Sequence, residues 1–375
     1  MHPARPGRLS PSHLPRQPRV AVVGGGIAGV SAAAALAERG VEVHLLEREP
    51  QLGGRLRGWP VTLADGSAAT MTRGFHAFFR QYYNLRALLR RADPDGLALT
   101  PLADYPLVDA DGHADSFKGL PRTPPWNALA FALTSPTFRW RDLLTRIDPV
   151  AALPLLDVSV PEIYQRLDDQ DAMTFLQRVR FPAAAQHLAF SVFSRSFFAD
   201  PRELSAAELA TMFHIYFLGS SEGLVFDVTV EPFLQAVWEP MRSYLTGIGV
   251  TVRTGAEVHE IIPGRQRRFL ARTTATEVDV DAVVLAADVP GLQTLLAASP
   301  SLGEPGWRRQ VGRLRTAPPF LVSRLWLDRP VRRDRPGFLG TSGFGSLDNV
   351  SVLERFEGEA ARWARRSGGS VVELH

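Results

Sequence analysis

The sequence predicts an α/β fold in which one domain is discontinuous and a second domain, of mixed α+β structure and rich in aromatic residues, is inserted into it. An apolar strand, a glycine-rich turn, an alanine-rich helix and a second apolar strand follow one another between residues 20 and 46. A further apolar segment at Asp281–Ala287 is typical of another buried strand of the same parallel sheet. The segment between them is long enough to form a domain of its own.

Length and composition fit a folded protein of two or three domains. The chain has 375 residues, of which 45% are hydrophobic and 22% are charged, the usual globular balance. Cysteine is absent, which excludes disulfides, thiolate metal sites and iron–sulfur clusters; we expect no metal, and electron chemistry would need a bound organic cofactor. The net charge is only +3 and the basic residues form no long stripe, so we expect no nucleic-acid partner.

The first motif is a glycine-rich turn between a strand and a helix. Val20–Val23 is an apolar, β-branched run that ends in G-x-G-x-x-G at residues 24–29. A helix is predicted over Ser31–Arg39 and a second buried strand over Val41–Leu46. Glu47 follows that strand, 18 residues after the last glycine, near the spacing expected of an acid that accepts from a ribose hydroxyl. This order predicts a Rossmann-type dinucleotide site; a strand–helix–strand unit without a ligand is the alternative.

Each small residue of this turn has a physical task. Gly24 permits the tight turn, Gly26 lets the backbone approach a pyrophosphate, and Gly29 lets the helix pack closely on the strand. Ile27 and Ala28 lie between these glycines, just before the predicted helix, whose free N–H groups and positive dipole end favour phosphate. We therefore expect residues 24–29 to bind the diphosphate.

A second glycine pair distinguishes between cofactors. Arg48 follows the ribose acid, and Gly53, Gly54 and Arg55 come within eight residues of that acid. Adjacent glycines let the backbone pass close to a pyrophosphate, and an arginine offers a fork of donors to a phosphate oxygen. This pattern resembles the FAD-binding amine oxidase and carotenoid desaturase superfamily, and the resemblance implies FAD as the cofactor. An ordinary turn is the alternative.

The resemblance extends downstream. It implies that Gly74 and Phe75 lie beside the flavin ring and that the backbone of Val258 contacts the adenine. Strands are predicted over Val250–Arg253 and Ala256–Ile261.

These motifs predict the domain boundaries. Residues 1–18, rich in proline and arginine, are expected to form a disordered leader. The FAD-binding domain is expected at 19–117 and again at 244–290, and the substrate domain at 118–243 and 291–375.

The inserted domain is rich in aromatic residues, several at helical spacing, such as Phe190, Phe193 and Phe197. For any one of them, packing in a helical core is the simpler interpretation. Together they favour an apolar cavity that suits a long nonpolar substrate.

Longer strings carry a narrower resemblance. Residues 71–85, 193–201 and 212–223 are similar to the isorenieratene synthase type of β-carotene desaturase/methyltransferase. The resemblance implies an FAD-dependent carotenoid oxidoreductase that converts the β-ionone rings of β-carotene to aromatic rings by desaturation and methyl migration. It also implies an apolar carotenoid substrate and a separate electron acceptor, a quinone or oxygen.

Three residues are candidates for proton removal. We rank His76 first because the resemblance places it near the flavin, and then His214 and Glu222. A single histidine or glutamate on an apolar segment is more often structural, and this remains the alternative for each. Two other functions also stay open: a different FAD-dependent desaturase or amine oxidase, and a flavin- or lipid-binding chain without turnover.

Two expectations concern the ends of the chain and its location. No N-terminal apolar stretch resembles a signal peptide, and we expect a cytoplasmic protein, with contact to the inner face of the cell membrane. In this superfamily a late Gly-Asp segment contacts the cofactor, and none follows Pro290. We therefore expect the chain as given to bind FAD weakly or not at all.

Overall fold

The computed structural model describes residues 10–375 except 103, 117, 122, 125, 128, 129, 131, 132, 134–146, 182–199 and 224. Most of the string 193–201 therefore lies outside the described residues, as do Phe190, Phe193 and Phe197.

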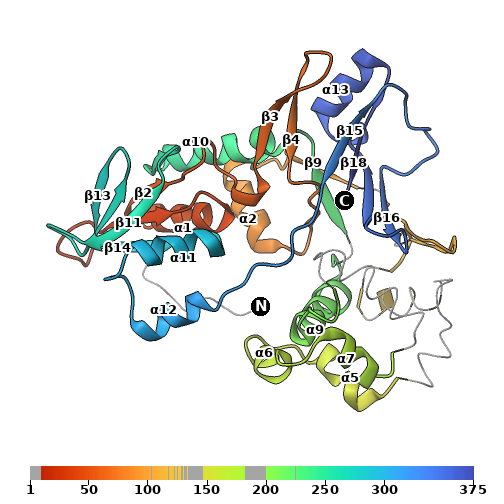
Figure 1. The fold of residues 1–375 in the computed structure, drawn as a ribbon, viewed down its shortest axis with the longest axis horizontal. Helices are drawn as coiled ribbons and strands as arrows, with labels where there is room; N and C mark the ends of the chain where they lie inside the picture. Colours follow the sequence, from red (N-terminus) through yellow and green to blue (C-terminus); the bar gives the residue numbers. More distant parts are fainter. Residues whose placement is uncertain are drawn as a thin grey trace.

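A parallel sheet forms the centre of the first domain. Its strand order is β10-β2-β1-β14, with bounds Thr251–Arg253, Glu42–Leu46, Arg19–Val23 and Ala282–Leu285. Val22 lies opposite Leu45 on one side and Val284 on the other, so β1 has partners along both edges. The predicted parallel sheet is confirmed, including the strand that returns from far along the chain (Figure 1).

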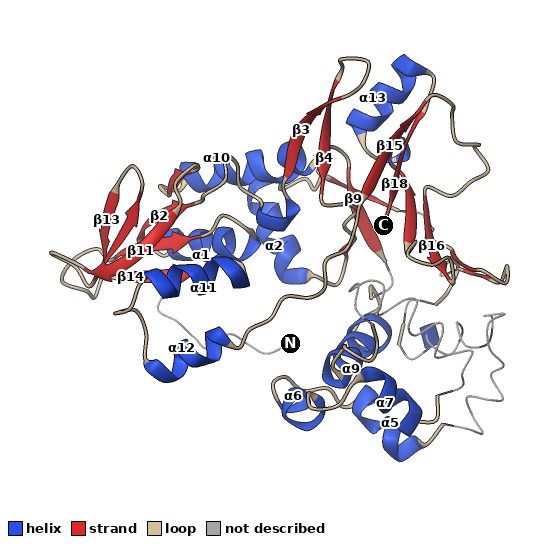
Figure 2. Cartoon of the chain, viewed as in Figure 1, coloured by secondary structure: helices blue, strands red, loops and turns tan. Residues whose placement is uncertain are grey.

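Both faces of this sheet are covered, which explains why the inner parts of its strands are rich in apolar residues. Val20 and Val22 point into a core shared with one group of helices, whereas Ala21 and Val23 point into a core on the opposite face. The first group comprises α1 (Ile27–Ala37), α2 (Tyr83–Ala92), the π-helix η4 (Leu234–Trp238) and α10 (Glu239–Gly247). Figure 2 shows α1, α10 and α11 beside the sheet.

An antiparallel sheet and two helices cover the opposite face. The sheet is β11-β12-β13 (Val258–Pro263, Phe269–Thr273 and Glu277–Val280), and the helices are α11 (Val289–Ala298) and α12 (Pro305–Gly312). Asp288 caps α11 by accepting a hydrogen bond from the Gly291 N–H. Leu295 and Val311 pack into the same core as Ala21. Residues 291–312, which the sequence assigned to the substrate domain, thus belong structurally to the cofactor domain.

The second domain contains a six-stranded sheet of order β15-β18-β17-β16-β7-β8. The strand bounds are Ser323–Leu327, Ser370–Leu374, Asn349–Val352, Phe338–Ser342, Leu107–Asp109 and Ala114–Asp115. Strand β7 pairs in parallel with β16, so 107–115 joins this sheet through backbone hydrogen bonds rather than the first domain, to which the sequence assigned it. Strand β18 is paired on both sides, with β15 and with β17.

Shorter elements connect the two domains. The hairpin β3–β4 (Gly58–Thr62 and Ala68–Thr72) lies near β15, β18 and α13 (Gly358–Ser367) (Figure 1). A three-stranded sheet of order β5-β9-β6 joins Phe78–Phe79, Phe226–Thr229 and Leu99–Pro101. The segment after α12 crosses from the first domain to β15.

The inserted segment forms a helical lobe. It contains α5 (Pro149–Leu156), α6 (Glu162–Leu167), α7 (Ala172–Arg178), α9 (Ala206–Phe213) and the π-helix η3 (His214–Leu218). Asp148, Asp171 and Ser205 begin α5, α7 and α9 by accepting hydrogen bonds from free N–H groups of the first turn. Phe175, which is fully buried, lies at the centre of the lobe's core.

The described part of the expected leader contacts the first domain. Arg16 forms an ion pair with Asp281 at 2.7 Å, and the Gln17 side chain donates to the Gly40 carbonyl at 2.9 Å. These contacts hold residues 16–17 against the domain, where the sequence predicted disorder. Among the described residues, no helix is both long and apolar enough to cross a membrane.

Candidate functional site

The glycine-rich turn after β1 is a place where side chains cannot fit. Gly24 has φ +106°, a conformation that favours glycine, and a Cβ there would lie 2.5 Å from the Ala286 carbonyl oxygen. A Cβ at Gly29 would lie 1.8 Å from the Gly24 carbonyl oxygen. The start of the helix thus packs closely on the turn at Gly24.

The second glycine pair lies directly against the first turn. The Gly53 N–H donates to the Gly25 carbonyl at 2.9 Å, and a Cβ at Gly54 would lie 3.2 Å from the Gly26 Cα. Gly53 has φ +132°. Two motifs separated in the sequence therefore form one backbone surface without side chains, which lets a ligand approach both turns.

The helix that begins at this surface has a free N-terminus. Gly26 provides no side-chain cap for α1, and its first turn holds no acidic residue. Ile27 and Ala28 are exposed. Uncapped N–H groups and the helix dipole make this end suitable for a diphosphate.

Glu47 closes one side of the turn. Its side chain is buried, and its carboxylate accepts hydrogen bonds from the Gly25 N–H and, at 2.9 Å, from the Glu49 N–H. Each carboxylate oxygen then retains capacity for a further donor, as a ribose hydroxyl would supply. The Ala256 N–H donates to the Glu47 carbonyl at 2.8 Å, which brings the start of β11 alongside. Val258 packs its side chain into the core there.

The two arginines predicted to bind the cofactor, Arg48 and Arg55, differ in their contacts. Arg48 lies 3.5 Å from Glu49 and 3.8 Å from Asp288. Arg55 is exposed and has no ion pair or hydrogen bond within the described part of the chain. Of the two, Arg55 has the more available guanidinium for an anionic ligand.

The segment after β4 is anchored by a histidine that the sequence did not single out. Gly74 has φ +106°, and a Cβ there would lie 2.4 Å from the His375 ring. The Nε2 atom of His375 lies 3.1 Å from the Phe75 nitrogen and 3.0 Å from the Glu373 carboxylate. The backbone at Gly74 is thereby held in a conformation that a side chain would disturb.

A buried ion pair supports this anchor. Arg324 and Glu373 are 2.6 Å apart, with 3% and 0% of their side chains exposed. Arg324 also donates to the Thr70 carbonyl at 2.6 Å and to the Thr72 hydroxyl at 2.9 Å. Burial acts most strongly on Glu373 and would raise its pKa, but the hydrogen bond with His375 and the charge of Arg324 together hold that pKa below its usual range. In the sequence, Arg324 and Glu373 are each the charged residue of a mainly apolar strand. This pattern could have indicated that the two residues pair.

His76 is suited to accept a proton. Its Nδ1 lies 2.9 Å from the Gly74 carbonyl oxygen, and its ring lies 5.5 Å from the Phe233 ring. A carbonyl only accepts, so Nδ1 carries the proton and Nε2 keeps its lone pair. Burial is the largest influence on His76 and lowers its pKa; the hydrogen bond to Gly74 acts in the opposite direction. The imidazole is therefore neutral near pH 7.

The other two candidate bases lie elsewhere. His214 begins the π-helix η3, and its buried Nδ1 has no hydrogen-bond partner among the described residues. Glu222 follows this helix, and its backbone N–H bonds to the Ser220 hydroxyl at 3.1 Å. Within the described residues no hydrogen bond or ion pair joins His76 to either of them.

An aromatic cluster lies between the His76 segment and the helical lobe. Phe226 lies 4.7 Å from Tyr105 and 5.2 Å from Phe79, measured between ring centroids. The hydroxyls of Tyr82 and Tyr216 are 2.7 Å apart, and burial is the largest influence raising the pKa of both phenols. Tyr216 belongs to η3, and single-turn π-helices are frequent at functional sites. The sequence predicted aromatic enrichment but not these partners.

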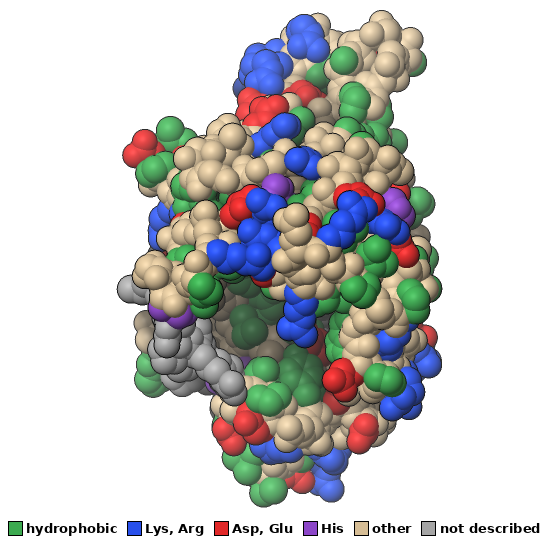
Figure 3. Space-filling view, turned by 90° about the vertical axis from the view of Figure 1, so that its left-hand side faces the viewer, with side chains coloured by type: hydrophobic (Ala, Val, Ile, Leu, Met, Phe, Trp, Pro, Cys, Tyr) green, Lys and Arg blue, Asp and Glu red, His purple; other side chains and the backbone are tan. Residues whose placement is uncertain are grey.

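The surface also carries a hollow. Seen from the side of β11 and β13, hydrophobic side chains form its floor (Figure 3). An apolar floor of this kind suits a nonpolar ligand.

Comparisons with known proteins show the family to which the chain belongs. A family model described as flavin containing amine oxidoreductase matches residues 27–373. A carotenoid phi-ring synthase of Streptomyces griseus is 65% identical over 358 residues, which cover 96% of this chain and 69% of the relative. A carotenoid phi-ring synthase of Chlorobaculum tepidum is 26% identical, covering 95% of this chain and 73% of the relative.

Solved structures share the architecture. Wild-type putrescine oxidase bound to putrescine has a TM-score of 0.67 at 16% identity, covering 96% of this chain and 75% of that one. A CLA-producing fatty acid isomerase from P. acnes has a TM-score of 0.57 at 14% identity, with coverage of 95% and 76%. At such identities the likeness shows the fold alone, and it confirms the predicted α/β class.

Replacing Gly29 by alanine should weaken FAD binding by about tenfold or more, because the new Cβ would displace the Gly24 carbonyl by steric conflict. The measurement is a fluorescence titration of purified chain with FAD. Gly247→Ala is the matched control, since a Cβ there meets nothing within 4 Å. Equal affinity in Gly29→Ala and the unsubstituted chain would contradict the prediction.

Proposed function

The chain belongs to the flavin-containing amine oxidoreductase family, and within it we propose a carotenoid oxidoreductase that converts β-ionone rings of β-carotene to aromatic rings. The observation that carries this proposal is the 65% identity, over 96% of the chain, with a protein named as a carotenoid phi-ring synthase. Because that name specifies a φ ring, the proposed product is a φ-ring aryl carotenoid. An isorenieratene-type product, with both rings aromatic, is one member of this class.

The cofactor is FAD, and the residues present fit it. Gly24, Gly26 and Gly54 leave a side-chain-free surface at the uncapped start of α1, suited to a diphosphate. Glu47 retains acceptor capacity for the ribose. Arg55 offers an uncommitted guanidinium. We further propose that Arg48, Gly53, Gly74, Phe75 and the Val258 backbone complete the cofactor site, in keeping with the resemblance that first implicated them.

FAD, when bound, supplies an acceptor for the hydride that the substrate ring loses. Loss of hydride leaves transient positive charge on that ring, methyl migration moves this charge to a neighbouring carbon, and proton loss removes it. The π faces of Phe79, Tyr105 and Phe226 are suited to stabilise the charge while it lasts. The Nε2 atom of neutral His76 is suited to take up the proton. His214 and Glu222 remain second and third candidates for this role.

A different carotenoid desaturation is the second candidate function. A probable zeta-carotene desaturase of Synechococcus elongatus is 26% identical over 74% of this chain, covering 60% of that relative. A quinone or oxygen is proposed as the electron acceptor in either case.

The proposed reaction is tested by expressing the chain in cells that accumulate β-carotene. The expected result is a new pigment whose mass spectrum and nuclear magnetic resonance spectrum identify an aromatic end group. Cells that accumulate ζ-carotene instead are the parallel arm. Conversion of ζ-carotene with no change in β-carotene would replace the first function by the second.

Replacing His76 by asparagine should keep the fold and FAD binding while lowering the rate of aromatisation by about a hundredfold or more. The amide nitrogen can still donate to the Gly74 carbonyl, but the variant has no Nε2 base. His113→Asn, at an exposed position, is the control.

The pH dependence of aromatisation follows from the direction of the His76 pKa shift. A lowered pKa keeps the base unprotonated down to below the ordinary value of 6.5, so activity should fall only on acidification below that value. An acidic limb unchanged in a slow His76→Asn variant would remove His76 from the mechanism.

We also propose that α5 contacts a lipid surface, which would bring the enzyme to an apolar substrate. Leu155 packs into the helical lobe, whereas Val150, Leu153 and Leu156 are 74%, 52% and 60% exposed. Exposed apolar side chains gathered on one face can mark a membrane-contact site.

Exchanging these three exposed residues for serine should lower co-sedimentation with phosphatidylcholine vesicles, since each loses apolar area that would enter the lipid. Leu97→Ser, at an exposed position outside α5, is the control. Equal co-sedimentation of both variants would contradict the proposed contact.

A further inference from the structure

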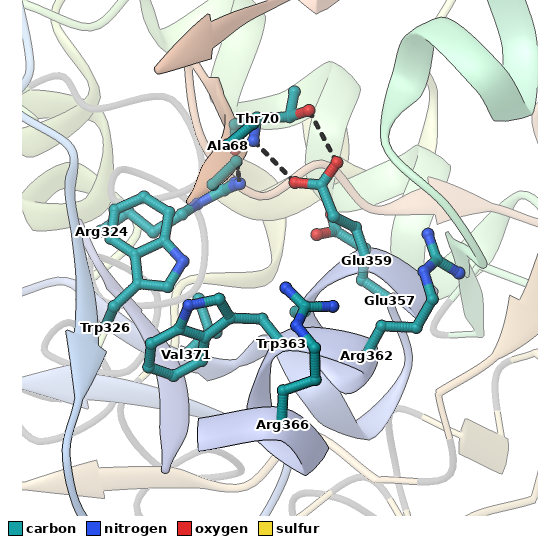
Figure 4. A pocket seen from close by; sticks show the side chains of 12 residues that line it. Ala68, Thr70, Arg324, Trp326, Glu357, Glu359, Arg362, Trp363, Arg366 and Val371 are labelled. Atoms are coloured by element: carbon teal, nitrogen blue, oxygen red, sulfur yellow. Dashed lines mark hydrogen bonds between the residues drawn. The ribbon is translucent and has the colours of Figure 1, made fainter. Parts of the chain in front are cut away.

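A cavity of about 250 Å³ lies between the β3–β4 hairpin, strands β15 and β18, and helix α13 (Figure 4). Its volume corresponds to about eight waters. The lining residues that carry the argument are Arg324, Trp326, Glu357, Glu359, Trp363 and Arg366. None of these residues belongs to the proposed cofactor site.

Glu357 is the unusual member of this lining. It is only 7% exposed, yet within the described residues its carboxyl group has neither a hydrogen bond nor an ion pair. A buried carboxylate without a partner is costly unless a ligand or a proton compensates it. The carboxyl group lies at the edge of an open cavity (Figure 4), so a ligand has room to reach it.

The neighbouring charges are engaged elsewhere. Arg324 is held by Glu373, Thr70 and Thr72. The Glu359 carboxylate accepts from the Thr70 N–H at 2.6 Å and from the Thr70 hydroxyl at 2.8 Å.

The outer charges do not neutralise Glu357 either. Arg362 is paired with Glu231 at 2.6 Å, and Arg366 is exposed on the last turn of α13. Glu359, Glu373 and Glu231 act on Glu357 as like charges, whereas Arg324 and Arg362 act as opposing charges. Arg324 and Arg362 are thus each paired with a carboxylate other than that of Glu357.

Two indoles form the apolar side of the cavity. Trp326 and Trp363 pack in one cluster with Val371, and Figure 4 shows them across the cavity from the side chains of Glu357 and Glu359. Indole faces attract cations within reach of the ring, and they also accommodate short alkyl chains. A carboxylate facing indoles is a combination suited to an organic cation.

We propose that this cavity binds a small organic ammonium ion, with its charge against Glu357 and its alkyl part against Trp326 and Trp363. The inference is independent of the proposed carotenoid reaction and includes no chemical change in the ammonium ion. Arg324 lines the cavity and pairs with Glu373, which contacts His375. A ligand in the cavity would thus be linked through Arg324, Glu373 and His375 to the Gly74–His76 segment.

Binding should depend on pH with a definite sign. Burial is the largest influence on Glu357, and with the like charges of Glu359, Glu373 and Glu231 it outweighs Arg324 and raises the pKa to about 7. Arg362 and Arg366 carry their charge throughout this range. A proton and an ammonium ion compete for the same carboxylate, so affinity should rise about tenfold between about pH 6 and about pH 8.

The test is a calorimetric titration of the full chain with propylammonium chloride, with propan-1-ol and sodium propionate as neutral and anionic counterparts. We expect saturable binding of propylammonium alone, and a loss of about tenfold or more in affinity in Glu357→Gln. Glu304→Gln, at an exposed position on the first domain, is the control. Circular dichroism melting verifies that each variant is folded.

If Glu357→Gln does not fold, a second variant tests the same binding. Trp363→Phe should weaken propylammonium binding and remove part of the tryptophan fluorescence change that accompanies it. Absence of propylammonium binding, equal binding of propan-1-ol, or binding of propionate that survives in Glu357→Gln would overturn the proposal.

Discussion

The contact between two glycine turns is the constraint on which the cofactor domain depends. The Gly53 N–H donates to the Gly25 carbonyl, and Gly54 lies so close to Gly26 that a Cβ would intrude. A side chain at Gly54 would press on the Gly26 backbone, and glycine avoids this contact. The same approach places α1, Glu47 and the second turn around one space, so the geometry available to a diphosphate is set by steric exclusion rather than by attraction.

The second domain is joined to this space by a buried ionic network. Arg324 and Glu373 pair inside the protein, and their partners reach Thr70, Thr72 and His375. A buried pair gives little net stability because desolvation opposes the attraction, but breaking it by removing one partner is strongly destabilising. The network therefore fixes where the Gly74–His76 segment lies more than it adds stability.

Local patterns determined much of the fold and the cofactor end of the site. The mainly apolar runs at 20–23, 41–46 and 281–287 became neighbouring parallel strands, because strands covered on both faces are rich in apolar residues. Pairing between distant segments was not predictable in the same way. Strand β7 pairs with β16 rather than with a strand of the first domain. A short strand flanked by polar residues has too little hydrophobic pattern to specify its partner. The aromatic cluster around Phe226 likewise depends on segments far apart in the chain.

The sequence by itself determined the fold class, the FAD motif and the placement of Glu47 beside the glycine turn, because glycine spacing and apolar periodicity act within a few residues. Only the tertiary structure decided that His375 and Glu373 hold the backbone at Gly74, and that Glu357 faces a cavity without a partner. These features arise from burial and charge balance, which depend on every segment that packs around a side chain. The identity of such a residue is read from the sequence, but its surroundings are known only from the folded structure.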